Sequence, residues 1–386
     1  MLAQSIPLSL YIHIPWCVKK CPYCDFNSHE NLGALPESAY VEALLCDLEG
    51  QKALIGQRMI QTIFIGGGTP SLFLPKSLET LLKGVRSRVS VADDAEITLE
   101  ANPGTAEASK FNRYREIGVT RLSIGIQSFD SDILQKIGRI HDGREAIAAA
   151  EMAKTAGFSE FNLDLMFGLP GQTETLALND IETAIGLHPT HLSFYQLTLE
   201  PNTVFHKYPP VLPHEEDTWA IQELGQSRLR QAGFQQYEVS AYAQAGSRCR
   251  HNLNYWQFGD YLGIGAGAHG KITLSDTGDI LRTQRLKQPA SYMQAAQEET
   301  SLGSASQVHR DEMAFEFLMN GLRLREGFEI RHFKPRTGWE MAQLEPTLSG
   351  LVKEDLLERT PTHIRCTDHG FNFLDSILQH FLPPSC

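Results

Sequence analysis

The sequence predicts an α/β fold, an open and partial (β/α)6 barrel followed by a mainly helical, winged-helix-like domain. Over residues 8–197, six short runs of β-branched or apolar residues alternate with stretches of helical period, as in parallel sheets covered by helices. Six such units are fewer than the eight of a closed barrel, so we expect an open sheet. From about Val308 onward, helix-like stretches precede a β-hairpin candidate at Leu357–Cys366.

The barrel elements follow one another in regular order. The expected strands are Leu8–Ile14, Thr62–Ile65, Glu96–Glu100, Arg121–Ile126, Glu160–Leu165 and His191–Leu197. The segments between the strands have apolar residues at helical spacing. Two clear examples are Val41, Leu44, Leu45 and Leu48 in the first segment, and Leu78, Leu81, Leu82 and Val85 in the second.

A break follows the sixth strand, because four prolines fall within residues 200–214. We expect a helix from about Glu215 to Gln231, a short strand near Tyr237–Tyr242, and then a glycine-rich patch at Gly263–Gly270. These signals divide the chain into a barrel core at 1–200, a linker with an α/β extension at 201–305, and a helical domain at 306–386.

Composition excludes several classes of protein. The 386 residues are 42% hydrophobic and 21% charged, which is enough to build a sizeable core. A net charge of −12 argues against a nucleic-acid partner. Only three of the seven cysteines are clustered, which is unlike a disulfide framework. Without a secretory pattern or a run of ~18 apolar residues, the sequence favours a cytoplasmic protein.

The most informative motif is Cys17-x3-Cys21-x2-Cys24. Three thiolates are one fewer than a closed tetrahedral metal site needs, and a [4Fe–4S] cluster held by three cysteines keeps one iron open to a small molecule. The alternative is a zinc site completed by His13, Asp25 or His29. Zinc sites commonly use a second cysteine pair, which this chain lacks, so the spacing favours the cluster.

Polar and glycine residues follow the later strands. The loop Gly66–Pro70 comes directly after the second strand, and its glycines allow backbone N–H groups to approach a ligand. Glu100, Gln127 and Asp164 lie where the third, fourth and fifth strands end, and Arg139 follows the fourth. Singly, each residue is better read as a cap or a surface ion pair. Their shared position at the carboxyl ends of parallel strands favours one binding site.

The segment His251–Trp256, with the sequence His-Asn-Leu-Asn-Tyr-Trp, has two interpretations. The histidine can bind haem iron while the two rings pack on the porphyrin. Alternatively, the histidine is a hydrogen-bonded residue in a buried turn. From the residue types alone, the second interpretation is favoured.

Together these motifs resemble those of radical-SAM proteins, and within them the oxygen-independent coproporphyrinogen III oxidase-like group. The resemblance covers essentially the whole chain and includes Tyr11–Phe26, Gly66–Ser71, Glu100–Gly104, Ser123–Phe129, Asn162–Gly171, His251–Trp256 and Gly263–Lys271. The combination is highly specific, although several of these pieces alone are not.

The resemblance implies a [4Fe–4S] cluster on Cys17, Cys21 and Cys24, with S-adenosylmethionine (SAM) chelating the open iron. Electron transfer into the sulfonium would then cleave SAM to a 5′-deoxyadenosyl radical. The residues implied to contact this SAM are Tyr11, Gly67 and Glu100. In the related oxidase a second SAM is contacted by the positions that match Tyr23, Gly68, Thr69, Gln127, Arg139 and Asp164.

Two departures separate this chain from the oxidase. Phe26 stands where the oxidase has a fourth cysteine, and Cys17 lies almost at the start of the chain, whereas the oxidase has a longer leading segment. The His251–Trp256 segment instead matches the haem-chaperone branch of the group, which makes His251 the candidate haem ligand. The resemblance thus implies a haem chaperone that passes haem to apo-haem proteins, including membrane-associated respiratory ones.

In this interpretation SAM supports haem transfer through its cleavage or through a cluster-dependent homodimer. The first alternative is an oxygen-independent coproporphyrinogen III oxidase or a related porphyrin-modifying enzyme. A tRNA-modifying radical-SAM enzyme would need a basic face, which the net charge of −12 does not favour.

Overall fold

The computed structural model describes residues 6–30, 33–298 and 303–383. Its main sheet has 12 strands in this described part, in the order β14-β13-β12-β11-β1-β4-β5-β6-β7-β8-β10-β9. The strands from β11 to β8 in this order run parallel, and both ends of the sheet are antiparallel. Within the residues that the structure describes, the edge strands β14 and β9 do not pair with each other, so the predicted open, partial barrel is confirmed.

The six predicted barrel strands are all present, and most are longer than predicted. They are β1 (Leu8–Ile14), β4 (Ile60–Gly67), β5 (Val91–Ala101), β6 (Arg121–Gln127), β7 (Glu160–Phe167) and β8 (His191–Gln196). The other strands of the main sheet are β9 (Gln235–Gln236), β10 (Ala241–Ala243), β11 (Asp260–Ile264), β12 (His269–Thr273), β13 (Ile280–Arg285) and β14 (Gly303–Gln307).

Alternation along each strand separates an apolar outer face from a polar inner face. In β1, Leu8, Leu10 and Ile12 are at most 1% exposed and join the core formed with the outer helices, whereas Tyr11 and His13 point to the other face. Burying each of these apolar side chains contributes about 1.5–3 kcal/mol. The sheet is therefore held from outside, and its inner face is left free to carry polar groups.

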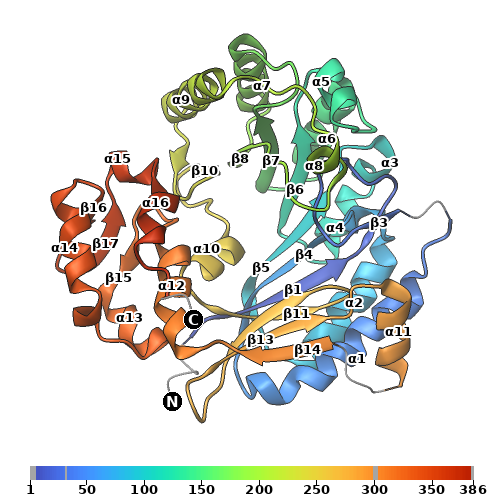
Figure 1. Cartoon of the computed structure of the whole chain (residues 1–386). Helices are drawn as coiled ribbons and strands as arrows, with labels where there is room; N and C mark the ends of the chain where they lie inside the picture. The colour runs from blue at the N-terminus through green and yellow to red at the C-terminus, as the bar shows by residue number, and fades with distance from the viewer. Residues whose placement is uncertain (1–5, 31–32, 299–302, 384–386) are drawn as a thin grey trace.

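Helices cover the outer face of the sheet (Figure 1). The helices up to residue 298 are α1 (Glu37–Ile55), α2 (Pro75–Arg88), α3 (Thr105–Ala108), α4 (Phe111–Glu116), α5 (Ser131–Lys136), α6 (Gly143–Thr155), α7 (Glu174–Gly186), α8 (Val204–Lys207), α9 (Glu215–Gln231), α10 (Arg250–Trp256) and α11 (Pro289–Gln297). Of these, α10 packs on the inner face, where His251 contacts Thr62 and Phe64. Local signals fix their ends: Asp142 and Glu145 form a capping box at the start of α6. No helix in the described ranges is both long enough and apolar enough to span a bilayer.

The C-terminal segment has the predicted winged-helix-like order of elements. It contains α12 (Arg310–Gly321), β15 (Phe328–Glu329), α13 (Ile330–Thr337), α14 (Glu345–Lys353), β16 (Leu357–Arg359), β17 (His363–Cys366), α15 (Asp368–Phe371) and α16 (Leu374–Gln379). Its three strands pair in the order β15-β17-β16. In Figure 1 this segment, orange to red, lies across α10 from the sheet.

One strand was predicted wrongly. The single strand expected near Tyr237–Tyr242 is two short strands, β9 and β10, because the Tyr237 N–H bonds back to the Ala241 carbonyl and the chain turns between them. Strands β11–β14, which the sequence did not reveal, extend the same sheet from β1. The domain boundaries at 200 and 305 stay predictions.

Candidate functional site

The three clustered cysteines lie in the loop after β1, at the carboxyl end of the parallel strands. Cys17 ends the short strand β2 (Trp16–Cys17), which pairs with β3 (His29–Glu30). The Cys24 N–H donates to the Cys21 carbonyl at 3.2 Å, and this turn brings the three thiols to one cavity.

Each half-buried thiol has a polar neighbour. The Thr69 hydroxyl donates to Cys17 Sγ at 3.5 Å, and Arg139 Nη1 donates to Cys21 Sγ at the same distance. Burial raises the pKa of Cys17 and of Cys24, so a soft metal would be needed to ionise them at neutral pH. In the described ranges, no three His, Cys, Asp or Glu side chains converge on a single-ion site. This donor set of free thiols on a cavity wall fits a metal cluster.

This cavity, of about 150 Å³, is called the small cavity below. It brings together every residue predicted to hold the cluster or SAM except Tyr11: Cys17, Cys21, Tyr23, Cys24, Gly67, Gly68, Thr69, Glu100, Gln127, Arg139 and Asp164. These side chains come from the loops and ends of five successive parallel strands.

Two glycines at the end of β4, Gly67 and Gly68, shape the floor of the small cavity. Gly67 has a φ of +115°, and a Cβ atom there would lie 2.5 Å from the His13 ring. A Cβ on Gly68 would lie 2.6 Å from the Trp16 carbonyl oxygen. Both positions therefore require glycine, and the close approach leaves the Gly67 N–H to donate to Glu100 Oε2 at 2.9 Å.

Two partly buried carboxyl groups face this floor. Burial raises the pKa of Glu100 to about 7, against the opposing effect of the Gly67 N–H bond. Burial also raises the pKa of Asp164, which accepts hydrogen bonds from Asn162 Nδ2 at 2.8 Å and Ser123 Oγ at 3.4 Å. A cationic or hydroxyl-bearing ligand would stabilise both groups as carboxylates.

Arg139 and Gln127 line another part of the small cavity. Arg139 Nη2 donates to Asn102 Oδ1 at 2.8 Å and to the Gly125 carbonyl at 2.6 Å, while its buried Nε has no partner among the described residues. Gln127 ends β6 with a φ of +72° and accepts from the Tyr195 hydroxyl at 2.7 Å. A non-glycine residue in this conformation is strained, as is common at binding sites.

The two tyrosines are placed differently. Tyr23 packs against Phe205 and lines the small cavity. The Tyr11 hydroxyl hydrogen-bonds His13 Nδ1 at 2.8 Å, and Tyr11 lines a second cavity. This large cavity has a volume of about 1030 Å³ and shares Cys24, Phe26, Ser28, Gly67 and Glu100 with the small one. A bulky molecule in the large cavity would therefore touch the cysteine loop.

His251 is on the wall of neither cavity. It is completely buried in α10; Nδ1 hydrogen-bonds the Thr62 hydroxyl and Nε2 the Tyr255 hydroxyl, both at 2.8 Å. Burial lowers the pKa of His251 to about 3, so the ring is neutral. Its predicted role as a haem ligand stays a prediction, and in this arrangement neither ring nitrogen is free for iron.

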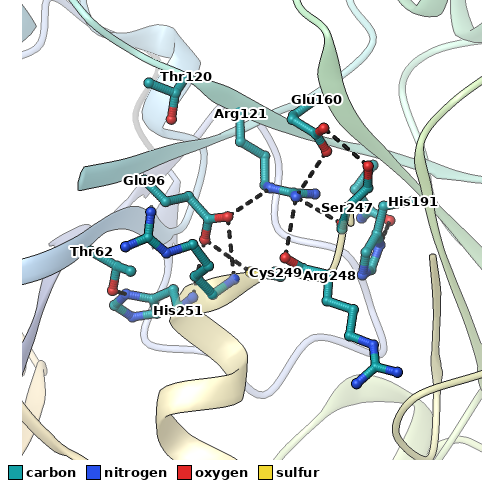
Figure 2. A network of polar contacts seen from close by, with 12 residues as sticks. Thr62, Glu96, Thr120, Arg121, Glu160, His191, Ser247, Arg248, Cys249 and His251 are labelled. Atoms are coloured by element: carbon teal, nitrogen blue, oxygen red, sulfur yellow. Dashed lines mark hydrogen bonds and ion pairs between the residues drawn. The ribbon is translucent and has the colours of Figure 1, made fainter. Parts of the chain in front are cut away.

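A buried polar network surrounds His251 at the amino ends of the strands (Figure 2). Glu96 of β5 accepts the His251 N–H at 3.0 Å and ion-pairs with Arg121 of β6 at 3.2 Å. Arg121 also pairs with Glu160 of β7 at 3.0 Å. The Cys249 thiol donates to Glu96 at 3.5 Å. The network anchors the first turn of α10 to the sheet.

Sequence reasoning missed several residues on both cavity walls. In the small cavity these are Asn102, Ser123 and Tyr195; in the large one they include Tyr261, His269, Arg282 and Lys287. A polar residue at every second position of a buried strand, as in Asn162 and Asp164, was the available signal for the first group. The second group comes from strands that were not predicted, except Lys287, which lies just after β13.

The fold and this site are those of the radical-SAM class of proteins. Residues 11–183 match the model of the Radical SAM superfamily, and residues 308–373 match that of the HemN C-terminal domain. The solved structure of coproporphyrinogen III oxidase (HemN) from Escherichia coli superposes with a TM-score of 0.83 at 24% identity, over 98% of this chain and 91% of that one. This likeness shows a common fold.

Curated relatives place the chain more narrowly. Heme chaperone HemW of Escherichia coli is 51% identical over 97% of this chain and 98% of its own length. Heme chaperone HemW of Haemophilus influenzae is 48% identical over 97% and 98% respectively. The chain therefore belongs to the HemW family of radical-SAM proteins.

Proposed function

We propose that the protein is a haem chaperone, which binds haem and passes it to proteins that require it. The observation that carries this proposal is the contact between the two cavities. The large cavity has a volume at the upper end of the usual range for ligand sites, about 300–1,000 Å³, and adjoins the cysteine loop. The names of the relatives at 51% and 48% identity point to the same cargo.

We further propose that Cys17, Cys21 and Cys24 hold a [4Fe–4S] cluster, which the radical-SAM match implies. When bound, such a cluster would offer an open iron to SAM and supply an electron for its cleavage. In this proposal Tyr11, Gly67 and Glu100 would contact SAM; the Glu100 carboxylate suits its α-amino group, and Asp164 suits ribose hydroxyls.

Haem recipients include membrane-associated respiratory proteins in this proposal, and delivery takes place in the cytoplasm. A homodimer that depends on the cluster is part of the same hypothesis. Phe26 supports a carrier over an oxidase, because this apolar ring is 59% exposed and lines both cavities. An exposed aromatic side chain on a cavity wall suits the face of a porphyrin.

One observation favours a second candidate, an oxygen-independent coproporphyrinogen III oxidase. Tyr23, Gly68, Thr69, Gln127, Arg139 and Asp164, which match a second SAM site in the oxidase, all line the small cavity. An anaerobic assay with reductant and SAM distinguishes the two. Formation of protoporphyrinogen IX from coproporphyrinogen III would support the oxidase, and its absence would remove it.

The test of the chaperone proposal has two stages. The full chain is reconstituted anaerobically with iron and sulfide, loaded with haem, and separated from free haem. It is then mixed with an apo-haem protein, and the recipient's own absorption spectrum reports transfer. We expect saturable haem binding followed by transfer. If the separated chain carries no more haem than a protein-free control, the proposal is contradicted.

A further inference from the structure

The late strands of the sheet form one wall of the large cavity. In the pairing of β11, β12 and β13, Tyr261 lies opposite Lys271, and Lys271 lies opposite Arg282. His269 is two residues before Lys271, so all four side chains share one face of the sheet. All four line the large cavity. This wall combines an aromatic ring, an imidazole and cations.

The three histidines of the large cavity differ in their availability. His13 has both ring nitrogens engaged, by the Tyr11 hydroxyl and by the Asn27 carbonyl at 2.9 Å. His29 is half-buried, and its buried Nε2 has no hydrogen-bond partner among the described residues. His269 is exposed, and neither of its ring nitrogens has a hydrogen-bond partner in the described part of the chain. It is therefore the most exposed of the three imidazoles and the one most accessible to a ligand in the cavity.

The charge around His269 suits the same ligand. Burial, followed by the neighbouring Lys287 and Arg282 cations, lowers the pKa of His269, which keeps the ring neutral and able to bind iron. Lys271 forms an ion pair with Asp260 at 3.3 Å. Arg282 forms an ion pair with Glu316 and donates a hydrogen bond to the Tyr261 hydroxyl. Exposed Lys287 has no ion-pair partner among residues 6–30, 33–298 and 303–383. A carboxylate ligand would satisfy it.

The glycine-rich turn before His269 ties this wall to the cysteine loop. A Cβ on Gly265 would lie 2.4 Å from the His13 carbonyl oxygen, and one on Gly267 would lie 2.4 Å from the Asn27 amide. Asn27 Nδ2 donates to the carbonyls of Ala266 and Lys287, each at 2.9 Å. His269 and Lys287 are thus held against the segment that carries the cysteines.

We propose that haem binds in the large cavity with His269 as an axial ligand of its iron and with a propionate toward Lys287. Trp256, Tyr261 and exposed Phe26 supply aromatic surface for the porphyrin face. This inference rests on the proposed haem function and deepens it. In this arrangement Tyr255 and Trp256 of the His251–Trp256 segment line the haem cavity, and His251 attaches α10 to the sheet.

The test is a haemin titration of the reconstituted full chain, followed by Soret absorbance, on the wild type and on His269→Ala, His251→Ala and Lys287→Gln. His380→Ala removes an exposed histidine outside the cavity and is the matched control. We expect His269→Ala to weaken haem binding about tenfold or more, with a changed coordination spectrum that added imidazole restores. Lys287→Gln should weaken it a fewfold, and more so at low salt.

The outcomes separate this inference from the proposed function. If His269→Ala binds haem like His380→Ala while His251→Ala loses it, the assignment of His269 is overturned and the chaperone proposal stands. If the wild type binds no haem, the chaperone proposal fails first. Should His269→Ala not fold, as judged by circular dichroism, His269→Met replaces it: a thioether-type coordination spectrum supports the assignment, and a wild-type spectrum overturns it.

Discussion

Glu100 is a carboxyl group of the small cavity whose protonation changes near physiological pH. Its pKa is raised to about 7 because burial disfavours the charged carboxylate. Below its ordinary value of 4.5 the carboxyl group is protonated in both folded and unfolded chains, and no penalty applies. Between about pH 4.5 and 7 the unfolded chain loses this proton while the folded chain keeps it, so stability falls over this interval, and the full penalty of the buried charge applies above pH 7.

Replacing Glu100 by Gln should therefore stabilise the ligand-free protein above pH 7, by about 2 kcal/mol, and leave it unchanged near pH 4. Chemical denaturation at several pH values measures the difference. Glu151→Gln, at an exposed carboxylate, is the control and should show no such trend. Equal stability of Glu100→Gln and wild type at pH 8 would show that Glu100 is not strained by burial.

Gly68 provides a second test at the residue scale. Gly68→Ala forces a Cβ toward the Trp16 carbonyl, which also accepts the Thr69 N–H at 2.8 Å. We expect a loss of about 1–3 kcal/mol and less cluster per chain after reconstitution, measured as iron and acid-labile sulfide. Gly50→Ala, in α1 with open space around the added methyl, should be neutral or stabilising. Similar cluster content in both variants would contradict the close packing of this loop.

At the scale of the elements, the Glu96 carboxylate attaches the first turn of α10 to the sheet. Glu96→Ala removes the acceptor of two α10 backbone N–H groups and leaves buried Arg121 with Glu160 as its one carboxylate partner, so we expect a loss of about 3–5 kcal/mol. Asp94→Ala breaks an exposed contact to the same helix, with Arg250 at 3.3 Å, and should cost less than about 1 kcal/mol. Thermal or urea unfolding compares them; equal losses would refute the anchoring role of Glu96.

The sequence was informative about elements whose signals are local. Each barrel strand is a short apolar run flanked by helical periodicity, so its position could be predicted to within a few residues. Strands β11–β14 carry glycine and polar residues, such as Gly263 and Gln284, and they join the sheet through pairing of Leu8 with Asp260, far apart in the chain. That long-range contact has no local signature.

The candidate site shows the same limit. The carboxyl ends of parallel strands lie at the same end of a barrel. The strand order alone therefore predicted that Cys17, Glu100 and Asp164 lie close to one another. It could not show that His251 would be buried against Thr62, because that depends on how α10 packs at the opposite ends of the strands. His269 was hidden within the glycine-rich patch for the same reason.

At the scale of the whole molecule, three parts of the chain meet at the large cavity. The cysteine loop provides Phe26, the late strands provide His269, and α12 of the C-terminal segment provides Asn320. Arg323, just beyond α12, stacks over Trp256 at 4.3 Å and pairs with Glu238 at 3.0 Å. A cargo in this cavity would therefore contact both the barrel and the C-terminal segment.

We propose that haem occupies the large cavity beside a [4Fe–4S] cluster. An anaerobic haem titration of the cluster-loaded full chain, followed by absorption spectroscopy, tests it most directly. We expect a Soret band that saturates at one haem per chain while the cluster absorption persists. Absorbance that rises without saturation, with the spectrum of free haem, would contradict it.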